Sequence, residues 1–162
     1  MEKNKQMSLF GVGPKLAIIT LAYSVIIYFV NPANRNLFEI NFVSHTVLTV
    51  AGVVLLLFGL TLHVICGKTI VEIRKEDKLS TNGLYKMCRH PMYSVWIFFN
   101  IPAIALLFGS WLALTIPVFM YLIFRIFIRT EENYLKERYP QDYIEYKKNI
   151  NLVFPCLWRL VR

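Results

Sequence analysis

The chain has 162 residues, of which 56 % are hydrophobic and only 17 % are charged, and its mean hydropathy is +0.48. Ordinary soluble domains carry about 25 % charged residues, so the composition excludes a disordered chain and argues strongly against a soluble globular domain. The three cysteines, Cys66, Cys88 and Cys156, form no C-x-x-C pair, which excludes a disulfide scaffold and a zinc ribbon. The net charge of +8 would suit nucleic acid, so the placement of the charges has to decide.

Three long apolar runs occur at Pro14–Val30, Ser44–Cys66 and Met92–Ile128. The last run contains one charged residue, Arg125, and breaks near its middle at Gly109-Ser110, which divides it into two. A membrane-spanning helix needs about 20 apolar residues, and continuous runs are typical of helices rather than of barrel strands. We therefore predict an all-α polytopic membrane protein with four transmembrane helices, of which the last two form a hairpin.

The first run follows lysines, as in a secretory signal, but no small-x-small cleavage site comes after Val30, so we expect an uncleaved anchor. Lysines and arginines are frequent before this run, in 67–91 and from Arg125 onward, whereas Arg35 is the single one between the first two runs. The positive-inside rule then predicts that both termini and the central loop are cytoplasmic, in a plasma, inner or endomembrane. The positive charge is thus explained by topology and anionic lipid, and we predict no nucleic-acid partner.

We expect a single integral-membrane domain, 1–162, made of a two-helix part, 1–66, and a motif-bearing part, 67–162. Polar and turn-forming residues predict a linker over Ile70–Asn82. Tyrosines spaced three to four residues apart predict a helical tail over Thr130–Lys148 that restarts at Pro140, and Val153–Trp158 is typical of an interfacial segment. The cysteines lie at or near the reducing face and are expected as free thiols.

The segment Arg89-His90-Pro91-x-Tyr93 is the most informative part of the sequence. Pro91 pushes His90 out of the helical region and suits the first position of a helix. The third helix should therefore begin at Pro91, with its free N–H groups, Arg89, His90 and the Tyr93 hydroxyl facing one membrane surface. A helix N-terminus with such donors favours a carboxylate or a phosphate. The alternative is that Arg89 and His90 are only interfacial anchors.

A second polar group, Arg125, Arg129, Glu131 and Glu132, ends the fourth helix. Arg125, Arg129 and Glu132 share one stripe of that helix, and the hairpin brings them to the same membrane face as His90. The alternatives are snorkelling of Arg125 and a surface pair between Glu132 and Lys136. Neither His45 nor His63 has a second ligand at metal spacing, so no metal is expected.

Together these residues resemble the integral-membrane isoprenylcysteine carboxyl methyltransferase and phospholipid methyltransferase family. The matching positions, in order, are Gly83, Tyr85, Arg89, His90, Pro91, Tyr93, Glu131, Glu132, Tyr139, Tyr143 and Tyr146, over roughly Lys78–Pro155. The family usually has glycine two residues after the motif tyrosine, where this chain has Val95.

The resemblance implies methyl transfer from S-adenosylmethionine to a lipophilic or lipidated acceptor at the cytoplasmic membrane face. It assigns cofactor binding to Tyr85, Arg89, His90, Pro91, Tyr93, Glu131, Glu132 and Tyr143. Arg125 or Arg129 would hold a carboxylate acceptor, and Glu132 would act as the base for an amine acceptor. Two other hypotheses are a membrane reductase that uses a nicotinamide cofactor and a non-enzymatic lipid-binding or assembly protein.

Overall fold

The computed structural model of the protein describes residues 11–76 and 79–154. Its helices are α1 (Gly13–Ala33), α2 (Arg35–Phe38), α3 (His45–Glu76), the 3₁₀-helix η1 (Gly83–Lys86), α4 (Pro91–Val95), the π-helix η2 (Trp96–Asn100), α5 (Ile101–Phe108), α6 (Thr115–Arg138) and α7 (Pro140–Asn149). Within these ranges the only β pairing is an isolated bridge between Glu39 and Ser110. The prediction of an all-α fold is confirmed.

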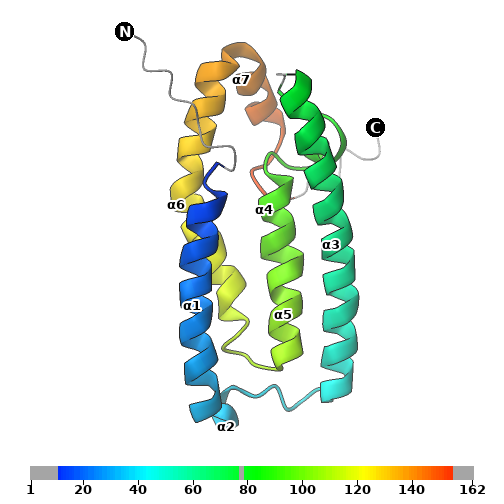
Figure 1. Ribbon diagram of the computed structural model, residues 1–162, viewed down its shortest axis with the longest axis vertical. Coiled ribbons are helices and arrows are strands. Elements are labelled where there is room, and N and C mark those ends of the chain that lie inside the picture. The colour runs from blue at the N-terminus through cyan, green and yellow to red at the C-terminus, as the bar shows by residue number, and fades with distance from the viewer. Residues whose placement is uncertain (1–10, 77–78, 155–162) are drawn as a thin grey trace.

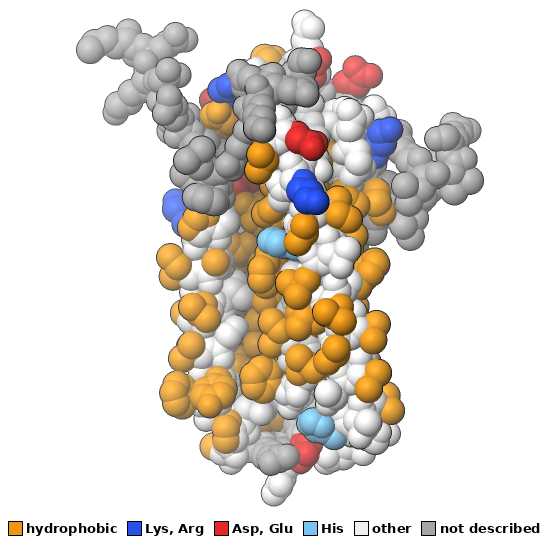
Figure 2. All heavy atoms as spheres, turned by 45° about the vertical axis from the view of Figure 1, so that its right-hand side comes forward, with side chains coloured by type: hydrophobic (Ala, Val, Ile, Leu, Met, Phe, Trp, Pro, Cys, Tyr) orange, Lys and Arg blue, Asp and Glu red, His pale blue; other side chains and the backbone are white. Residues whose placement is uncertain are grey.

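Three stretches of the described chain are long and apolar enough to cross a membrane: Gly13–Ala33, His45–Ile73 and Pro91–Phe108. Figure 2 shows hydrophobic side chains along the middle of the visible face, with most of the charged side chains gathered toward the upper end. These features indicate an integral membrane protein. α6 runs beside the spans in Figure 1, but it is not among the three stretches, so four spans stay a prediction.

Two predicted helix boundaries are confirmed. α4 begins at Pro91, and the N-cap residue His90 has φ −128°, outside the helical region. α5 ends at Phe108 because Gly109 takes a left-handed conformation, φ +59°, which glycine adopts at little cost.

The predicted linker over Ile70–Asn82 is wrong in its first half, because α3 continues to Glu76. The first half of this segment contains Glu72, Arg74, Lys75 and Glu76, and lysine, arginine and glutamate are good helix formers. α3 therefore extends ten residues past Cys66, the end of its apolar run. The tail prediction agrees better with the structure, since α6 ends at Arg138 and α7 starts at Pro140.

The helical stretch α4–η2–α5, which begins at Pro91, packs closely against α3. A Cβ on Gly59 of α3 would overlap the amide oxygen of Asn100, and one on Gly52 would lie 3.0 Å from the Ala103 carbonyl oxygen. Asn100 is fully buried and its side-chain amide makes no hydrogen bond within the described part of the chain. The two glycines thus let two helix backbones approach, as is common between membrane helices.

A hydrophobic core joins the first helix to the motif-bearing part. It contains Val12, Leu16, Ile97, Met120, Phe124, Ile128 and Val153, each at most 6 % exposed. In Figure 1 the start of α1, the end of α3, the start of α4, the end of α6 and all of α7 lie at one end of the bundle, opposite α2. The core therefore places residues from both ends of the described chain beside the Arg89–Tyr93 motif.

Two of the three cysteines, Cys66 and Cys88, are buried and form no disulfide within the described residues, in agreement with the prediction. Cys156 and residues 155–158 of the predicted interfacial segment lie outside the described residues, and so do Lys3 and Lys5. Val153, at the start of that segment, is buried in the core.

Candidate active site

The motif loop is held by the chain segment that follows α7. The backbone N–H of Arg89 donates to the Asn151 carbonyl at 2.9 Å, and that of His90 donates to the Leu152 carbonyl at 3.1 Å. One turn later the Ser94 hydroxyl donates to the Val153 carbonyl at 2.7 Å. These bonds fix Arg89 and His90 at the start of α4 without using either side chain.

The helix η1 is tied to the same tail. The Tyr146 hydroxyl donates to the Tyr85 carbonyl at 2.6 Å. Tyr146 packs with Tyr143 and Ile150 in a small core of their own. The Gly83–Lys86 turn therefore sits beside α7, and the Tyr85 side chain is half-buried near the motif.

Glu131 lies on the inward face of α6 and is 7 % exposed. Ile128 follows Phe124 by four residues and Glu131 follows Ile128 by three, so all three share the buried face of the helix. Glu131 Oε1 accepts hydrogen bonds from the Val12 backbone N–H at 2.6 Å and from the Tyr93 hydroxyl at 2.8 Å. Its Oε2 lies 3.6 Å from His90 Nδ1. The donors to this carboxylate, Val12 and Tyr93, are neutral.

Glu132, the next residue, is surrounded by cations. Arg89 Nη1 lies 2.6 Å from its Oε1, and Lys147 Nζ lies 2.8 Å from its Oε2. The Tyr143 hydroxyl also donates to Oε1, at 3.1 Å. The Arg89 and Glu132 side chains are only 9 % and 12 % exposed, so this ion pair is largely removed from water.

These surroundings move the pKa values in different directions. Burial lowers the pKa of His90 to about 4, against the opposing effect of Glu132, so the ring is neutral near pH 7. Burial raises the pKa of Glu131 despite its two hydrogen bonds. Burial opposes ionisation of Glu132 as well, but Lys147, Arg89 and Tyr143 together hold its pKa below the usual range. Burial, and next the Glu132 charge, raise the pKa of Tyr143.

Some polar atoms of the cluster are buried without a hydrogen-bond partner in residues 11–76 and 79–154. They include Nε2 of His90 and Nε of Arg89. The His90 ring packs beside Tyr93 and Phe124, with ring centroids 6.0 and 6.1 Å away, and those two rings also contact each other. A buried polar atom without a partner is costly, so these nitrogens are candidates for hydrogen bonds to a ligand.

The structure brings together most of the residues that the sequence singled out: Tyr85, Arg89, His90, Pro91, Tyr93, Glu131, Glu132 and Tyr143. Arg125 and Arg129 are instead exposed on α6, outside this buried cluster. Glu132 pairs with Lys147 rather than forming the surface pair considered with Lys136.

Sequence reasoning missed two members of the cluster. Lys147 stands four residues after Tyr143 on α7, and that helical spacing was a usable signal. Val12 donates its backbone N–H to Glu131 from 119 residues away, and no pattern of side chains in the sequence predicts this contact.

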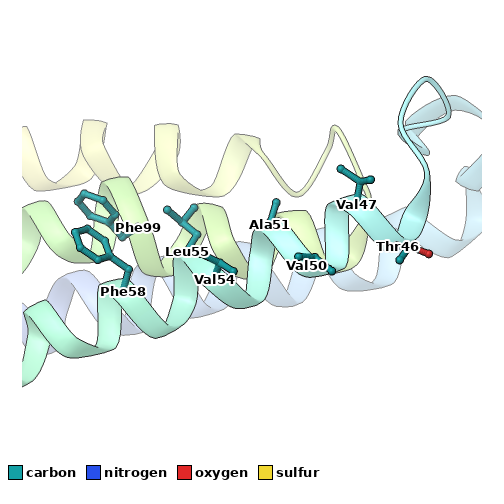
Figure 3. Close-up of a pocket in the computed structure, with 8 residues that line it drawn as sticks. All are labelled: Thr46, Val47, Val50, Ala51, Val54, Leu55, Phe58 and Phe99. Atoms are coloured by element: carbon teal, nitrogen blue, oxygen red, sulfur yellow. The ribbon is translucent and has the colours of Figure 1, made fainter.

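A separate groove of about 760 Å³ runs along the N-terminal half of α3. Its lining is almost entirely apolar and includes Val50, Val54, Phe58 and Phe99 (Figure 3). The groove begins near His45, at the end of the bundle opposite the charged cluster. It is therefore distinct from the cluster and has the character of a surface that faces hydrocarbon.

The fold and the cluster define a helical integral-membrane protein with a charged site at one end of its spans. A model of the isoprenylcysteine carboxyl methyltransferase family matches residues 45–137 of this chain. The chain belongs to that family, and the matched region contains Arg89, His90, Tyr93 and both glutamates.

Several eukaryotic proteins are similar to this chain. The protein-S-isoprenylcysteine O-methyltransferase of Saccharomyces cerevisiae is 31 % identical over 121 residues, which cover 67 % of this chain and 49 % of the yeast protein. Protein-S-isoprenylcysteine O-methyltransferase B of Arabidopsis thaliana is 31 % identical over 83 residues, 50 % of this chain and 42 % of the plant protein. The protein-S-isoprenylcysteine O-methyltransferase of Rattus norvegicus is 27 % identical over 121 residues, which cover 69 % of this chain and 43 % of the rat protein. The matches thus span less than half of each relative, and no solved structure matches the chain.

Proposed function

We propose that this protein transfers a methyl group from S-adenosylmethionine to the carboxylate of a lipophilic, isoprenylcysteine-type acceptor at the cytoplasmic membrane face. The observation that carries the proposal is the buried cluster of Arg89, His90, Tyr93, Glu131 and Glu132 inside the region that matches the family. The names of the relatives, which are isoprenylcysteine O-methyltransferases, support the acceptor class.

The residues present fit the methyl donor. Its amino acid part carries a carboxylate and an ammonium, and its nucleoside part carries hydroxyls and an aromatic base. The unpartnered nitrogens of Arg89 and His90, together with the N-terminus of the Pro91–Phe108 span, suit the carboxylate. Glu131 and Glu132 suit the ammonium or the ribose hydroxyls, and the rings of Tyr85, Tyr93 and Tyr143 suit the base and the sulfonium.

When bound, S-adenosylmethionine supplies an electrophilic methyl group, which an acceptor carboxylate oxygen takes as the sulfur–methyl bond breaks and leaves a neutral thioether. No proton has to move in this displacement. The chain's residues therefore need only to bind, orient and exclude water, which are the main sources of acceleration in such a reaction. We assign orientation to Arg89, His90 and Glu131, and we assign the attraction of the acceptor carboxylate to the exposed Arg125 and Arg129.

The surroundings of Glu132 favour a carboxylate acceptor over an amine acceptor. An amine must lose a proton to become a methylated neutral product, and Glu132 is the candidate base. Arg89 and Lys147 stabilise its ionised form and so weaken it as a base. Glu132 is better suited to binding a positive group than to accepting a proton.

The proposal includes a membrane topology. We infer that α6 crosses as a fourth span after the turn at Gly109, so that α1 to α7 form one domain with both termini cytoplasmic. The charged cluster then lies where a water-soluble donor meets a membrane-embedded acceptor. A lipidated acceptor would reach it from within the bilayer.

Calorimetric titration of the purified chain in detergent with S-adenosylmethionine, and separately with NADPH, tests the proposed class. We expect S-adenosylmethionine to bind and NADPH not to bind. In a transfer assay, we expect labelled methyl to be transferred to N-acetyl-farnesylcysteine but not to its methyl ester. His90→Ala should lower the transfer rate roughly 100-fold, because the orienting ring is lost.

His45→Ala is the matched control, since His45 is exposed and is the first residue of α3, whose start lies at the opposite end of the bundle. Equal losses of transfer rate in the two variants would mean that His90 is not part of the site. Binding of NADPH instead of S-adenosylmethionine would replace the proposal with a reductase.

A further inference from the structure

The turn that precedes α1 touches the proposed cofactor site through its backbone. Val12 donates its N–H to Glu131 Oε1 at 2.6 Å, across 119 residues of sequence. The residue before it, Gly11, has φ +56°, in the left-handed region. Through this turn, the described residues ahead of α1 contact a charged group of the motif-bearing part.

Glycine is required at position 11 for two separate reasons. A side chain at φ +56° is strained whatever the space around it. In addition, a Cβ would overlap Glu131 Oε1 and lie 2.7 Å from Glu131 Cδ. The carboxylate thus occupies the volume that a side chain at position 11 would need.

The turn is firmly held. Val12 and Leu16 are 6 % and 1 % exposed and pack with Phe124 and Ile128, which lie on the same face of α6 as Glu131. The donor nitrogen therefore has a fixed position relative to α6, and Glu131 Oε1 is held between it and the Tyr93 hydroxyl.

Holding one oxygen orients the other. With Oε1 occupied by Val12 and Tyr93, Oε2 is directed toward His90, whose Nδ1 is 3.6 Å away and whose Nε2 has no hydrogen-bond partner in the described residues. An unrestrained glutamate side chain populates several rotamers. The turn restricts Glu131 to one rotamer in the ligand-free protein, and preorganisation of this kind increases affinity for a ligand.

We propose that the Gly11–Val12 turn is a positioning element that presents the Glu131 carboxylate to the methyl donor. It acts through Glu131 and does not touch the reacting atoms. The inference rests on the proposed function, because the benefit of a fixed carboxylate is measured as affinity for S-adenosylmethionine.

The first test compares Gly11→Ala with Gly109→Ala. Gly109 has nearly the same backbone conformation, φ +59°, but a Cβ there would make only ordinary contacts, the nearest at 3.7 Å, at the far end of the bundle. Both variants carry the backbone strain, and only Gly11→Ala displaces Glu131. We expect Gly11→Ala to raise the Kd for S-adenosylmethionine roughly tenfold or more, the effect of losing a charge-assisted hydrogen bond. Gly109→Ala should leave the Kd unchanged, and an equal Kd in both variants would overturn the inference.

The second test needs no ligand and also covers a Gly11→Ala chain that folds poorly. Each alanine is combined with Glu131→Ala, and thermal unfolding of the ligand-free proteins is followed. Without the Glu131 side chain there is nothing to displace, so Gly11→Ala should then lower Tm by no more than Gly109→Ala does. A Gly11→Ala loss that persists unchanged in the Glu131→Ala background would contradict the inference.

The two proposals fail in different ways. If the wild-type chain does not bind S-adenosylmethionine, the proposed function fails, whatever the melting experiment gives. If the wild-type chain binds it and the two glycine variants behave alike, the turn has no positioning role and the proposed function stands.

Discussion

Glu131 and Glu132 are neighbours in the sequence, yet the two sides of α6 that they face have opposite electrostatic character. Glu131 meets a backbone N–H, a tyrosine hydroxyl and a neutral histidine, and burial raises its pKa. Glu132 meets Arg89 and Lys147, which keep its pKa low. When the pKa values of two carboxylates differ in this way, the two groups can have different roles within one site. The protonation behaviour of a Glu-Glu pair is thus set by the helices that pack on it.

The largest expected effect comes from Glu132→Gln compared with Glu131→Gln. Removing the charge at 132 leaves Arg89 buried without its partner, and we expect a loss of about 3 kcal/mol in unfolding free energy. A glutamine at 131 keeps an oxygen for Val12 and Tyr93, so its cost should stay below about 1 kcal/mol. Chemical unfolding in detergent measures both. Similar losses in the two variants would mean that the electrostatic contrast is not real.

An intermediate effect should appear in the pH dependence of stability. The folded-state pKa of His90, about 4, is below the ordinary 6.5. As pH falls through 6.5, the unfolded chain gains a proton that the folded protein does not take up, so stability decreases. At pH 5 this loss amounts to about 2 kcal/mol relative to pH 8.

Ligand-free His90→Asn, which cannot titrate, is the comparison for this pH profile. Subtracting its profile removes the contribution of Glu131, whose raised pKa acts in the opposite direction on acidification. Parallel profiles for the wild type and the variant between pH 8 and 5 would show that the ring is not held neutral.

The smallest effect is expected from Lys147→Met. This side chain is 49 % exposed, so its ion pair with Glu132 is weakened by water and salt. We expect a loss of about 0.5 kcal/mol that decreases further at high salt. Lys148→Met, at the next and also exposed position, is the control. A loss as large as that of Glu132→Gln would mean that Lys147, rather than Arg89, is the main partner of Glu132.

The sequence predicted the helical elements well where a local rule applies. Pro91 marked the start of a helix and Gly109 marked an end, because each restricts or frees its own φ. The end of α3 was misplaced because charged residues suit both a helix outside the membrane and a loop. The grouping of Arg89 and His90 with the two glutamates followed from a motif plus a hairpin.

The remaining contacts of the site could not be read from the sequence. Val12, Asn151 and Leu152 contribute backbone atoms, and any amino acid other than proline can provide an N–H. Only their place in the folded chain selects them. By contrast, Lys147 was within reach of an argument from helical spacing, since Tyr143 had already been identified on α7.

The backbone bonds from Arg89 and His90 to Asn151 and Leu152 have a consequence for biosynthesis. Arg89 and His90 are synthesised some sixty residues before Asn151 and Leu152, whose carbonyls hold them. Val12, which donates to Glu131, is synthesised before all of these residues. A nascent chain that has already inserted its early helices therefore still has an unfinished cluster until residue 153 has left the ribosome. Completion of the cluster is thus a late event that depends on contacts between remote parts of the chain.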